Sequence, residues 1–421
     1  MSLIKKIRKK TQNKDIKTLI ENFLSLSLLQ IVGYILPLIT LPYIAKTIGL
    51  NNFGAIAFAS AVIVFFQTLT DYGFNYTGIR DVSRLREDKR ATSKVFSTIV
   101  YARFLLMVLS LMILCLCIYF IPQFNNNAKI LLFTFTLIPG YVMYPEWFFQ
   151  ALEKMKYSAI LSTVIKVLFT IFIFVFIKKE EDFIYIPLIN GVGFFVVGLG
   201  AFALIYKEGY GLVKINFRDI YRTIKDSTNM FISLILPNLY SNMSTIFLEN
   251  FWGKGATGVF DAGNKFLGIS QQITNVLSRT FYPFLARRMD KHSFYEKMSL
   301  VISLIISISL FLGAPLIVRI FFSHEFTAAI TVIRIMSLSP IFIFMMNAYG
   351  TNYLVLNGQE KILRNIVMFS SLIGLALSYF LVVNYSYIGA AYAIVISRGI
   401  SGILTLIFAK NKKRILNKIK L

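Results

Sequence analysis

The sequence predicts an all-α integral membrane protein with about twelve transmembrane helices. Three observations support this prediction: the composition, the repeated apolar runs and the positions of the basic residues. Of the 421 residues, 56% are hydrophobic and only 15% are charged, whereas soluble domains carry about 25% charged residues. The mean hydropathy is +0.67. No segment is long and polar enough to form a separate soluble domain.

Apolar runs of about 20 residues recur along the whole chain, and each can cross a hydrocarbon core of about 30 Å. The fourth and tenth runs are the least regular, because each ends in a polar stretch. The predicted spans are 22–45, 54–78, 96–121, 129–150, 158–178, 184–206, 228–249, 257–282, 299–320, 328–354, 363–383 and 389–409.

The basic residues alternate between the two sides of the membrane when the spans are numbered in this way. The N-terminal tail, the 80–95 loop, the 207–227 linker and the C-terminal tail are rich in Lys and Arg and fall on one side. Such loops stay in the cytoplasm, so both termini are predicted to be cytoplasmic. The formal net charge of +24 therefore reflects membrane topology, and no nucleic-acid partner is expected.

The two halves of the chain share short sequence matches with an offset close to 200 residues. Ile35-Leu36-Pro37 matches Ile235-Leu236-Pro237, Phe53-Gly54-Ala55 matches Thr257-Gly258-Val259, and Ala151-Leu152-Glu153-Lys154 matches Gly358-Gln359-Glu360-Lys361. Since six spans are an even number, a pseudo-two-fold axis along the membrane normal would relate the halves. The predicted organisation is a basic tail (1–21), a six-helix bundle (22–206), a cytoplasmic linker (207–227), a second six-helix bundle (228–409) and a basic tail (410–421).

Polar residues within the spans indicate a water-filled cleft, because ionisable groups at membrane depth usually face a cavity or a partner. The eighth span is the clearest case. Asp261, Lys265, Gln272 and Arg279 lie within about 40° of one another on a helix of about 3.6 residues per turn, and Asn264, Gln271 and Asn275 form an adjoining strip. The second span carries Asp71 and the seventh carries Asn242. The alternative is interhelical hydrogen bonding in a tight bundle.

Further basic residues lie inside other spans. Lys166 and Arg398 are expected to face the cleft, whereas Arg103 and Arg334 could equally pair structurally or extend to the interface. Lys265 could likewise be neutralised by Asp261 one turn away. A cleft lined with Arg and Lys would hold a phosphate or an acidic sugar. The candidate substrate-binding residues are Lys166, Lys265, Arg279, Arg398, Asp71, Asn242, Gln272, Arg103 and Arg334.

Features of enzymes and cofactor sites are missing from the sequence. It contains no P-loop motif for ATP, and His292 and His324 lack metal-ligand spacing. No Ser/His/Asp arrangement is expected to meet in one place. Transport is therefore favoured over catalysis, with no cofactor and no metal.

Three segments carry a resemblance to a known family. They are Gly49-Leu50-Asn51-Asn52-Phe53-Gly54 with Asp71-Tyr72-Gly73-Phe74-Asn75 and Arg80-Asp81; Tyr144-Pro145-Glu146-Trp147-Phe148-Phe149-Gln150-Ala151-Leu152-Glu153-Lys154-Met155; and Asn352-Tyr353-Leu354-Val355-Leu356-Asn357-Gly358-Gln359-Glu360-Lys361. In these segments, in length and in helix count, the chain resembles the bacterial polysaccharide transporter family, the Wzx-type O-antigen flippases.

The resemblance implies the fold of the multidrug/oligosaccharidyl-lipid/polysaccharide exporter superfamily, in which two six-helix bundles form a V around a central cavity. It also implies alternating access and an undecaprenyl-pyrophosphate-linked oligosaccharide, flipped from the cytoplasmic to the outer face of the bacterial inner membrane. The expected surroundings are the phospholipid bilayer and other polysaccharide-assembly proteins. Lipid II flippases of the same superfamily typically have more helices than the twelve expected here.

Two other functions remain open at this point. A multidrug/cation antiporter of the same fold would need a carboxylate-dominated cavity, and the excess of Arg and Lys argues against it. A membrane glycan polymerase or ligase would need a sizeable external loop with catalytic residues, and the external loops predicted here are short.

Overall fold

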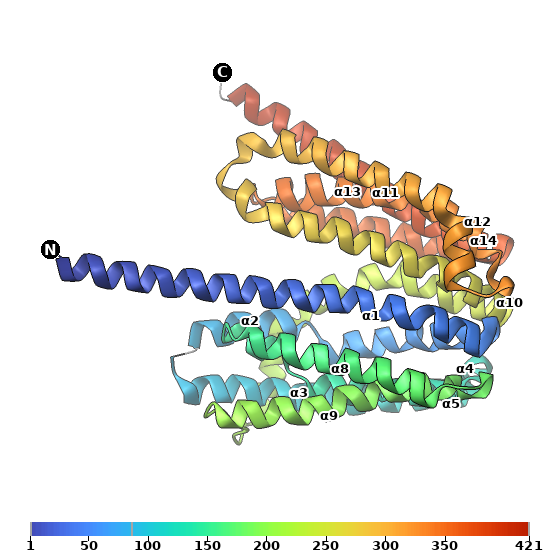
Figure 1. Ribbon diagram of the computed structural model, residues 1–421, viewed down its shortest axis with the longest axis horizontal. Helices are drawn as coiled ribbons and strands as arrows, with labels where there is room; N and C mark the ends of the chain where they lie inside the picture. The colour runs from blue at the N-terminus through green and yellow to red at the C-terminus, as the bar shows by residue number, and fades with distance from the viewer. Residues whose placement is uncertain (1, 86, 420–421) are drawn as a thin grey trace. The chain divides into compact units, whose positions relative to one another are not determined.

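The computed structural model of the protein describes the backbone of residues 2–85 and 87–419, which forms helices joined by non-helical connections (Figure 1). Side chains are described for residues 36–85, 87–282 and 284–411. The basic tail predicted at 1–21 and residues 412–421 of the C-terminal tail lie outside this set. Within the described backbone there is no strand.

The helices follow one another along the chain with short connections. Their bounds are α1 (Ser2–Asp71), α2 (Phe74–Leu85), α3 (Lys89–Phe120), α4 (Pro122–Asn126), α5 (Ala128–Phe135), α6 (Leu137–Met143), α7 (Glu146–Ala151), α8 (Met155–Phe176), η1 (Glu180–Ile184), α9 (Tyr185–Lys207), α10 (Phe217–Arg287), η2 (Met289–Lys291), α11 (His292–Phe321), η3 (His324–Phe326), α12 (Ala329–Met336), α13 (Ser339–Met345), the π-helix η4 (Met346–Val355) and α14 (Glu360–Ile419).

Nine helical stretches of the described residues are long and apolar enough to cross a membrane. Three of them are much longer than one crossing, with 50, 71 and 52 residues, where about 20 suffice. The long helices α1, α10 and α14 in these stretches are each interrupted by a residue with non-helical backbone dihedral angles: Gly49, Gly253 and Ser386. These residues lie between pairs of predicted spans, so each long stretch consists of two helices that meet at a break.

The chain divides into two compact units, and each is described by itself. The first unit contains Met1–Tyr43, Phe66–Lys178 and Ile184–Phe231, and the second contains Ile44–Phe65, Lys179–Phe183 and Ile232–Leu421.

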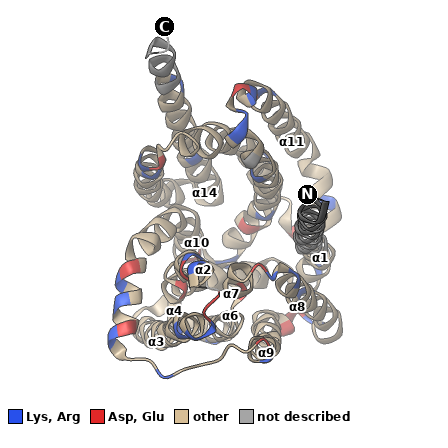
Figure 2. Ribbon diagram, turned by 90° about the vertical axis from the view of Figure 1, so that its left-hand side faces the viewer, with Lys and Arg blue, Asp and Glu red and all other residues tan. Residues whose placement is uncertain are grey.

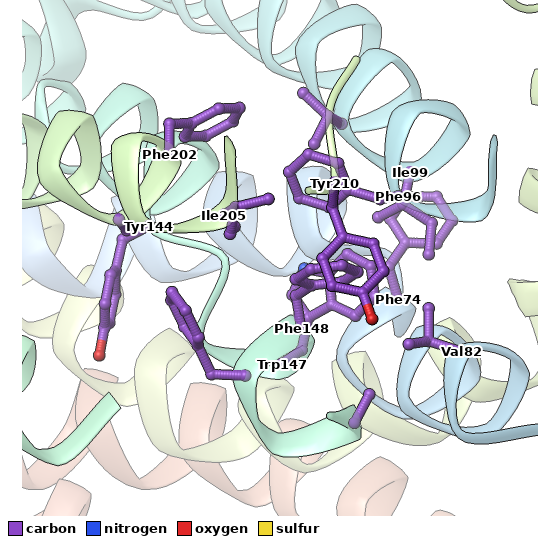
Figure 3. Close-up of a cluster of buried hydrophobic side chains, with 14 of the residues drawn as sticks. Phe74, Val82, Phe96, Ile99, Tyr144, Trp147, Phe148, Phe202, Ile205 and Tyr210 are labelled. Carbon is purple, nitrogen blue, oxygen red and sulfur yellow. The ribbon is translucent and has the colours of Figure 1, made fainter. Parts of the chain in front are cut away.

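The core of the first unit is a cluster of aromatic side chains (Figure 3). Phe96 of α3 lies 4.6 Å from Phe148 of α7 between ring centroids, and Phe148 lies 5.4 Å from Tyr210. Trp147 and Phe148, from a family-like segment, are 2% and 0% exposed, so this segment of the family resemblance forms part of the core.

In the second unit, two matched glycines of the sequence repeat pack against each other. A Cβ atom on Gly54 would lie 1.9 Å from the carbonyl oxygen of Lys254 and 2.8 Å from the backbone nitrogen of Gly258. The preceding glycines of the two matched segments, Gly49 (φ 71°, ψ 173°) and Gly253 (φ 78°, ψ −175°), have nearly the same dihedral angles. Positive φ favours glycine because it has no Cβ. The repeat is thus present in backbone conformation as well as in sequence.

Gly54→Ala is expected to destabilise the second unit by about 1–3 kcal/mol, because the new methyl group forces apart two backbones that touch. The melting temperature of the detergent-purified protein measures the effect. Gly200→Ala in α9 is the matched control, since a Cβ there meets nothing within 4 Å and alanine raises helix propensity by about 1 kcal/mol. Equal melting temperatures for Gly54→Ala and the wild type would contradict the close approach.

A polar cluster joins the ends of three elements in the first unit. The Lys154 ammonium donates to the Glu208 carboxylate just after α9, and the Tyr157 hydroxyl donates to the same group at 3.3 Å. Lys89 also donates to the backbone carbonyl of Glu208 at 2.9 Å. The hydrogen bond from Lys154, followed by the charge of Lys154 and the Tyr157 bond, holds the pKa of Glu208 below its ordinary value of 4.5.

Glu208→Gln is expected to lower the free energy of unfolding by about 0.2–1 kcal/mol at pH 7, as for a largely solvated ion pair. Because the folded-state pKa is lowered, the contribution is complete above the ordinary pKa of 4.5 and is lost as the pH falls through the folded-state value. Melting curves of wild type and variant should therefore differ at pH 7 and converge below pH 4.5. If the difference in melting temperature between wild type and Glu208→Gln instead grew as the pH fell, the predicted direction of the pH dependence would be wrong.

Candidate functional site

The polar side of α10 in the second unit is divided into two faces. The inner face is a column of Gln271, Asn275 and Ser278, which bond to other helices. The Asn275 Oδ1 accepts a hydrogen bond from Asn347 at 3.1 Å, and Asn352 donates to the Ser278 hydroxyl at 3.1 Å. Gln271 and Asn275, which belong to the strip that the sequence placed beside the charged residues, are therefore used for packing within the unit.

The other face of α10 carries the charged residues predicted from the sequence; Figure 2 colours the positions of Lys, Arg, Asp and Glu along the helices. Lys265, Gln272 and Arg279 are exposed in the structure. The Lys265 ammonium lies 3.3 Å from the Asp261 carboxylate, yet its side chain stays 49% exposed while that of Asp261 is 14% exposed. Arg279 takes part in none of the ion pairs formed by the described side chains. This face offers two cations against one carboxylate.

Arg398 of α14 approaches the inner column of α10. One guanidinium nitrogen, Nη2, donates to Gln271 Oε1 at 2.9 Å, and the group also interacts with Tyr240. The other terminal nitrogen, Nη1, is buried and has no hydrogen-bond partner. Among the described residues no carboxylate neutralises Arg398. A buried guanidinium held only by neutral groups can accept an anion as its missing partner.

The π-helix η4 lies beside this arrangement. Asn347 and Asn352 of η4 reach α10, as described, and His292 Nε2 of α11 bonds to the Ala348 carbonyl at 2.8 Å. The Tyr349 hydroxyl donates to Glu296 Oε1 at 2.5 Å. π-Helical turns occur frequently at functional sites. The π-helix was not predicted from the sequence. Its sequence signal is Asn352, because an amide inside an apolar span needs hydrogen-bond partners, and Asn352 is 0% exposed in the structure.

Arg103 and Asp71 form a pair in the first unit. Arg103 Nη2 lies 3.2 Å from Asp71 Oδ1 and donates to Asn75 Oδ1 at 2.7 Å. The Arg103 side chain is 2% exposed and that of Asp71 is 23% exposed. Of the two alternatives for Arg103, the geometry is that of the structural pair.

The remaining candidates have weaker surroundings. Lys166 of α8 is half-buried and interacts with the charge of Glu146. Arg334 of α12 is exposed, with its guanidinium carbon 5.6 Å from the ring centroid of Phe311. Asn242 is half-buried and donates to the Asn238 carbonyl at 3.3 Å. In the part of the chain that the structure describes, no cluster of His, Cys, Asp or Glu could hold a metal ion.

Relatives of the chain are named for O-antigen transport and for capsular polysaccharide biosynthesis. It is 27% identical over 410 residues to a putative O-antigen transporter of Escherichia coli (strain K12), covering 95% of this chain and 99% of the relative. A putative O-antigen transporter of Shigella dysenteriae is 23% identical, covering 92% and 98%. The capsular polysaccharide biosynthesis protein CapF of Staphylococcus aureus is 22% identical, covering 74% and 80%.

Solved transporters share the fold. The lipid II flippase MurJ in an inward closed conformation matches with a TM-score of 0.73 at 16% identity, covering 91% of this chain and 87% of MurJ. An inward-facing multidrug resistance MATE family transporter of the MOP superfamily matches with a TM-score of 0.68 at 15% identity, covering 94% and 99%. At these identities the likeness concerns the fold alone, and it agrees with the all-helical, multi-pass architecture expected from the sequence.

The family model that describes the "Polysaccharide biosynthesis protein" family matches residues 19–289. Together with the nine membrane-length stretches of the described residues, this match indicates a multi-pass protein of the bacterial inner membrane. The resemblance of the chain to the Wzx-type polysaccharide transporters is confirmed. The chain belongs to the polysaccharide biosynthesis protein family of transporters.

Proposed function

We propose that this protein is a flippase that moves an undecaprenyl-pyrophosphate-linked oligosaccharide repeat unit across the inner membrane. The observation that carries the proposal is the cationic surroundings of α10 in the second unit. Arg279 lies on the open face without an ion pair among the described residues, and Arg398 has a buried nitrogen without a hydrogen-bond partner. Planar guanidinium groups suit phosphate oxygens because they donate two hydrogen bonds at once.

The roles of individual side chains follow from their surroundings. Arg279, Lys265 and Arg398 would bind the pyrophosphate, while Gln272 and Asn242 would donate to sugar hydroxyl groups. Lys166, in the first unit, stays a candidate cation for binding substrate. Arg103 with Asp71, and Arg334 over Phe311, already have partners in the structure, so we assign them to holding the helices in place.

The proposed architecture keeps twelve transmembrane helices in two six-helix bundles, 22–206 and 228–409, with both termini and the 207–227 linker in the cytoplasm. The three helix breaks at Gly49, Gly253 and Ser386 support this count, because each separates two predicted spans. The contact between Gly54 and Gly258 supports a pseudo-two-fold axis, since a residue touches its repeat mate where such an axis passes.

The proposed mechanism is alternating access from the cytoplasmic to the outer face, in which the site opens to one side of the membrane at a time. The anionic head group would leave water for the cationic surface while the prenyl chain stays among the lipid tails. A low-dielectric site strengthens the attraction between guanidinium and pyrophosphate groups. The surface must release the head group on the outer face, so its affinity has to differ between the two states.

Deletion of the gene tests the function. The deletion strain should lose its surface polysaccharide and accumulate the lipid-linked repeat unit on the cytoplasmic face, where it resists enzymes added outside the cell. Wild-type protein supplied in trans should restore both. Unchanged surface polysaccharide in the deletion strain would refute the proposal.

A multidrug/cation antiporter is the second candidate, because a MATE transporter shares the fold. The same deletion strain separates the two functions: greater sensitivity to cationic drugs with normal polysaccharide would favour the antiporter. Glycan elongation by the purified protein would instead favour a polymerase or ligase.

A further inference from the structure

A stripe of small and apolar side chains on α3 runs along the first unit at helical spacing. Ser93, Ser97, Tyr101, Leu105 and Val108 follow one another at intervals of three or four residues, so they share one face of the helix. Ser93 and Ser97 are 6% and 0% exposed, whereas Tyr101, Leu105 and Val108 are 39%, 42% and 38% exposed. Another part of the chain therefore covers Ser93 and Ser97, whereas Tyr101, Leu105 and Val108 remain exposed.

The segment between α9 and α10 packs over these two serines. The backbone N–H of Val213 donates to the Ser97 hydroxyl at 2.8 Å, and that of Gly211 donates to the Ser93 hydroxyl at 3.4 Å. The chain then leaves the stripe at Lys214 and enters α10 at Phe217. Two serines one turn apart therefore fix where Lys214 lies along α3.

A groove of about 770 Å³ opens beyond this point. Such a volume falls within the range of about 300–1,000 Å³ that is typical of small-molecule sites. Its apolar lining on α3 consists of Tyr101, Phe104, Leu105 and Val108, and Phe217 and Ile220 of α10 also line it. Lys214 and Asn216 contribute the polar side chains at its lining.

The charged residues near the start of α10 pair with one another and not with Lys214. Lys94 pairs with Asp219 at 3.0 Å, and Arg222 pairs with Asp226 at 3.9 Å. Lys214 is exposed and joins no ion pair within the described side chains, and the same holds for Arg218 in the first turn of α10. Phe217 and Tyr221, between these cations, are 71% and 61% exposed. A helix that displays aromatic and basic residues together is typical of binding to anionic lipid surfaces.

We propose that this groove binds one anionic phospholipid, with its phosphate at Lys214 and an acyl chain along Tyr101, Leu105 and Val108. The apolar lining matches a hydrocarbon chain, and the unpaired ammonium at its polar lining matches a negative head group. The site lies wholly within the first unit and shares no residue with the proposed transport surface. It is separate from the proposed transport function and does not depend on it.

Native mass spectrometry of the full-length protein in detergent tests the proposal. 1-Palmitoyl-2-oleoyl phosphatidylglycerol should remain bound at lower concentrations than the phosphatidylcholine with the same chains. Lys214→Gln should weaken phosphatidylglycerol binding about fivefold, the effect of one basic residue at an anionic lipid surface, and Lys214→Arg should restore it. Lys225→Gln is the matched control, because Lys225 is exposed on the same helix outside the groove.

Two further arms separate the lipid from simpler ligands. Dihexanoyl phosphatidylglycerol should bind more weakly than the long-chain lipid if the apolar lining is used, and inorganic phosphate should not displace the long-chain lipid. The proposal is overturned if both lipids are retained equally, if Lys214→Gln binds like the wild type, or if Lys225→Gln loses as much binding as Lys214→Gln. Displacement by inorganic phosphate, or equal binding of the short-chain lipid, would also overturn it.

Discussion

Arg103→Ala is expected to destabilise the first unit by about 3–5 kcal/mol, because it breaks a buried ion pair and leaves one charge without its partner. The Arg103 side chain is 2% exposed and holds both Asp71 and Asn75. Removing the guanidinium leaves the Asp71 carboxylate next to a cavity inside a membrane span. We expect little folded protein in a size-exclusion profile after extraction, and a much lower melting temperature for what remains.

Two matched variants show whether the loss comes from the buried charge. Arg222→Ala removes a cation whose side chain is 83% exposed and whose ion pair spans 3.9 Å, so it should cost less than about 1 kcal/mol. The double variant Asp71→Asn with Arg103→Gln removes both charges at similar volume and should recover most of the stability. If Arg103→Ala melts like the wild type but fails to export polysaccharide, Arg103 binds substrate and the structural assignment is wrong.

The pair at Arg103 shows where reasoning from the sequence stops. An arginine inside an apolar span indicates a partner or a cavity, and the sequence does not distinguish the two. Asp71 and Arg103 lie on different helices, 32 residues apart in sequence, and helical spacing relates only residues of one helix. The pairing depends on how α1 and α3 pack, which no local pattern specifies.

The helical spans were more predictable, because length and hydropathy are local properties. The all-helical fold follows directly from them, since backbone groups in lipid must be bonded within a segment. The conformations of Gly49 and Gly253 could also be expected in part, because each glycine precedes a matched segment. The break at Ser386, with φ 53°, could not, since a serine with positive φ has no sequence signature. For the π-helix the sequence signal is the polar Asn352 inside an apolar span, which indicates buried partners but not the π-helical geometry.

Within the candidate site, periodicity correctly grouped the residues of α10 but did not identify their uses. Asp261, Lys265, Gln272 and Arg279 do share one face, and Gln271 and Asn275 do share the adjoining one. Only the contacts show that the face with Gln271 and Asn275 is bonded to Arg398 and Asn347. Lys265, Gln272 and Arg279 on the other face are exposed. Substrate binding by these residues stays a prediction, and Arg398 gives the sharpest test of it.

Arg398→Gln is expected to abolish most polysaccharide export while leaving the protein folded. The glutamine amide can still donate a hydrogen bond toward Gln271, but the variant loses the positive charge and the second donor edge that a pyrophosphate would use. Losing one hydrogen bond to a charged group costs about 1.5–3 kcal/mol, which corresponds to roughly 10- to 150-fold weaker binding of the head group. Surface polysaccharide in the complemented deletion strain, normalised to folded protein in the membrane, measures the effect.

The controls for Arg398 separate charge, shape and folding. Arg398→Lys keeps the charge and loses the planar fork, so it should export an intermediate amount. Arg364→Gln removes an exposed cation at the start of the same helix and should export like the wild type. If Arg398→Gln reaches the membrane in normal amounts and exports as much polysaccharide as Arg364→Gln, the unpartnered guanidinium serves packing alone. The anion-binding surface would then have to be sought on the open face of α10, where the same assay on Arg279→Gln gives the answer.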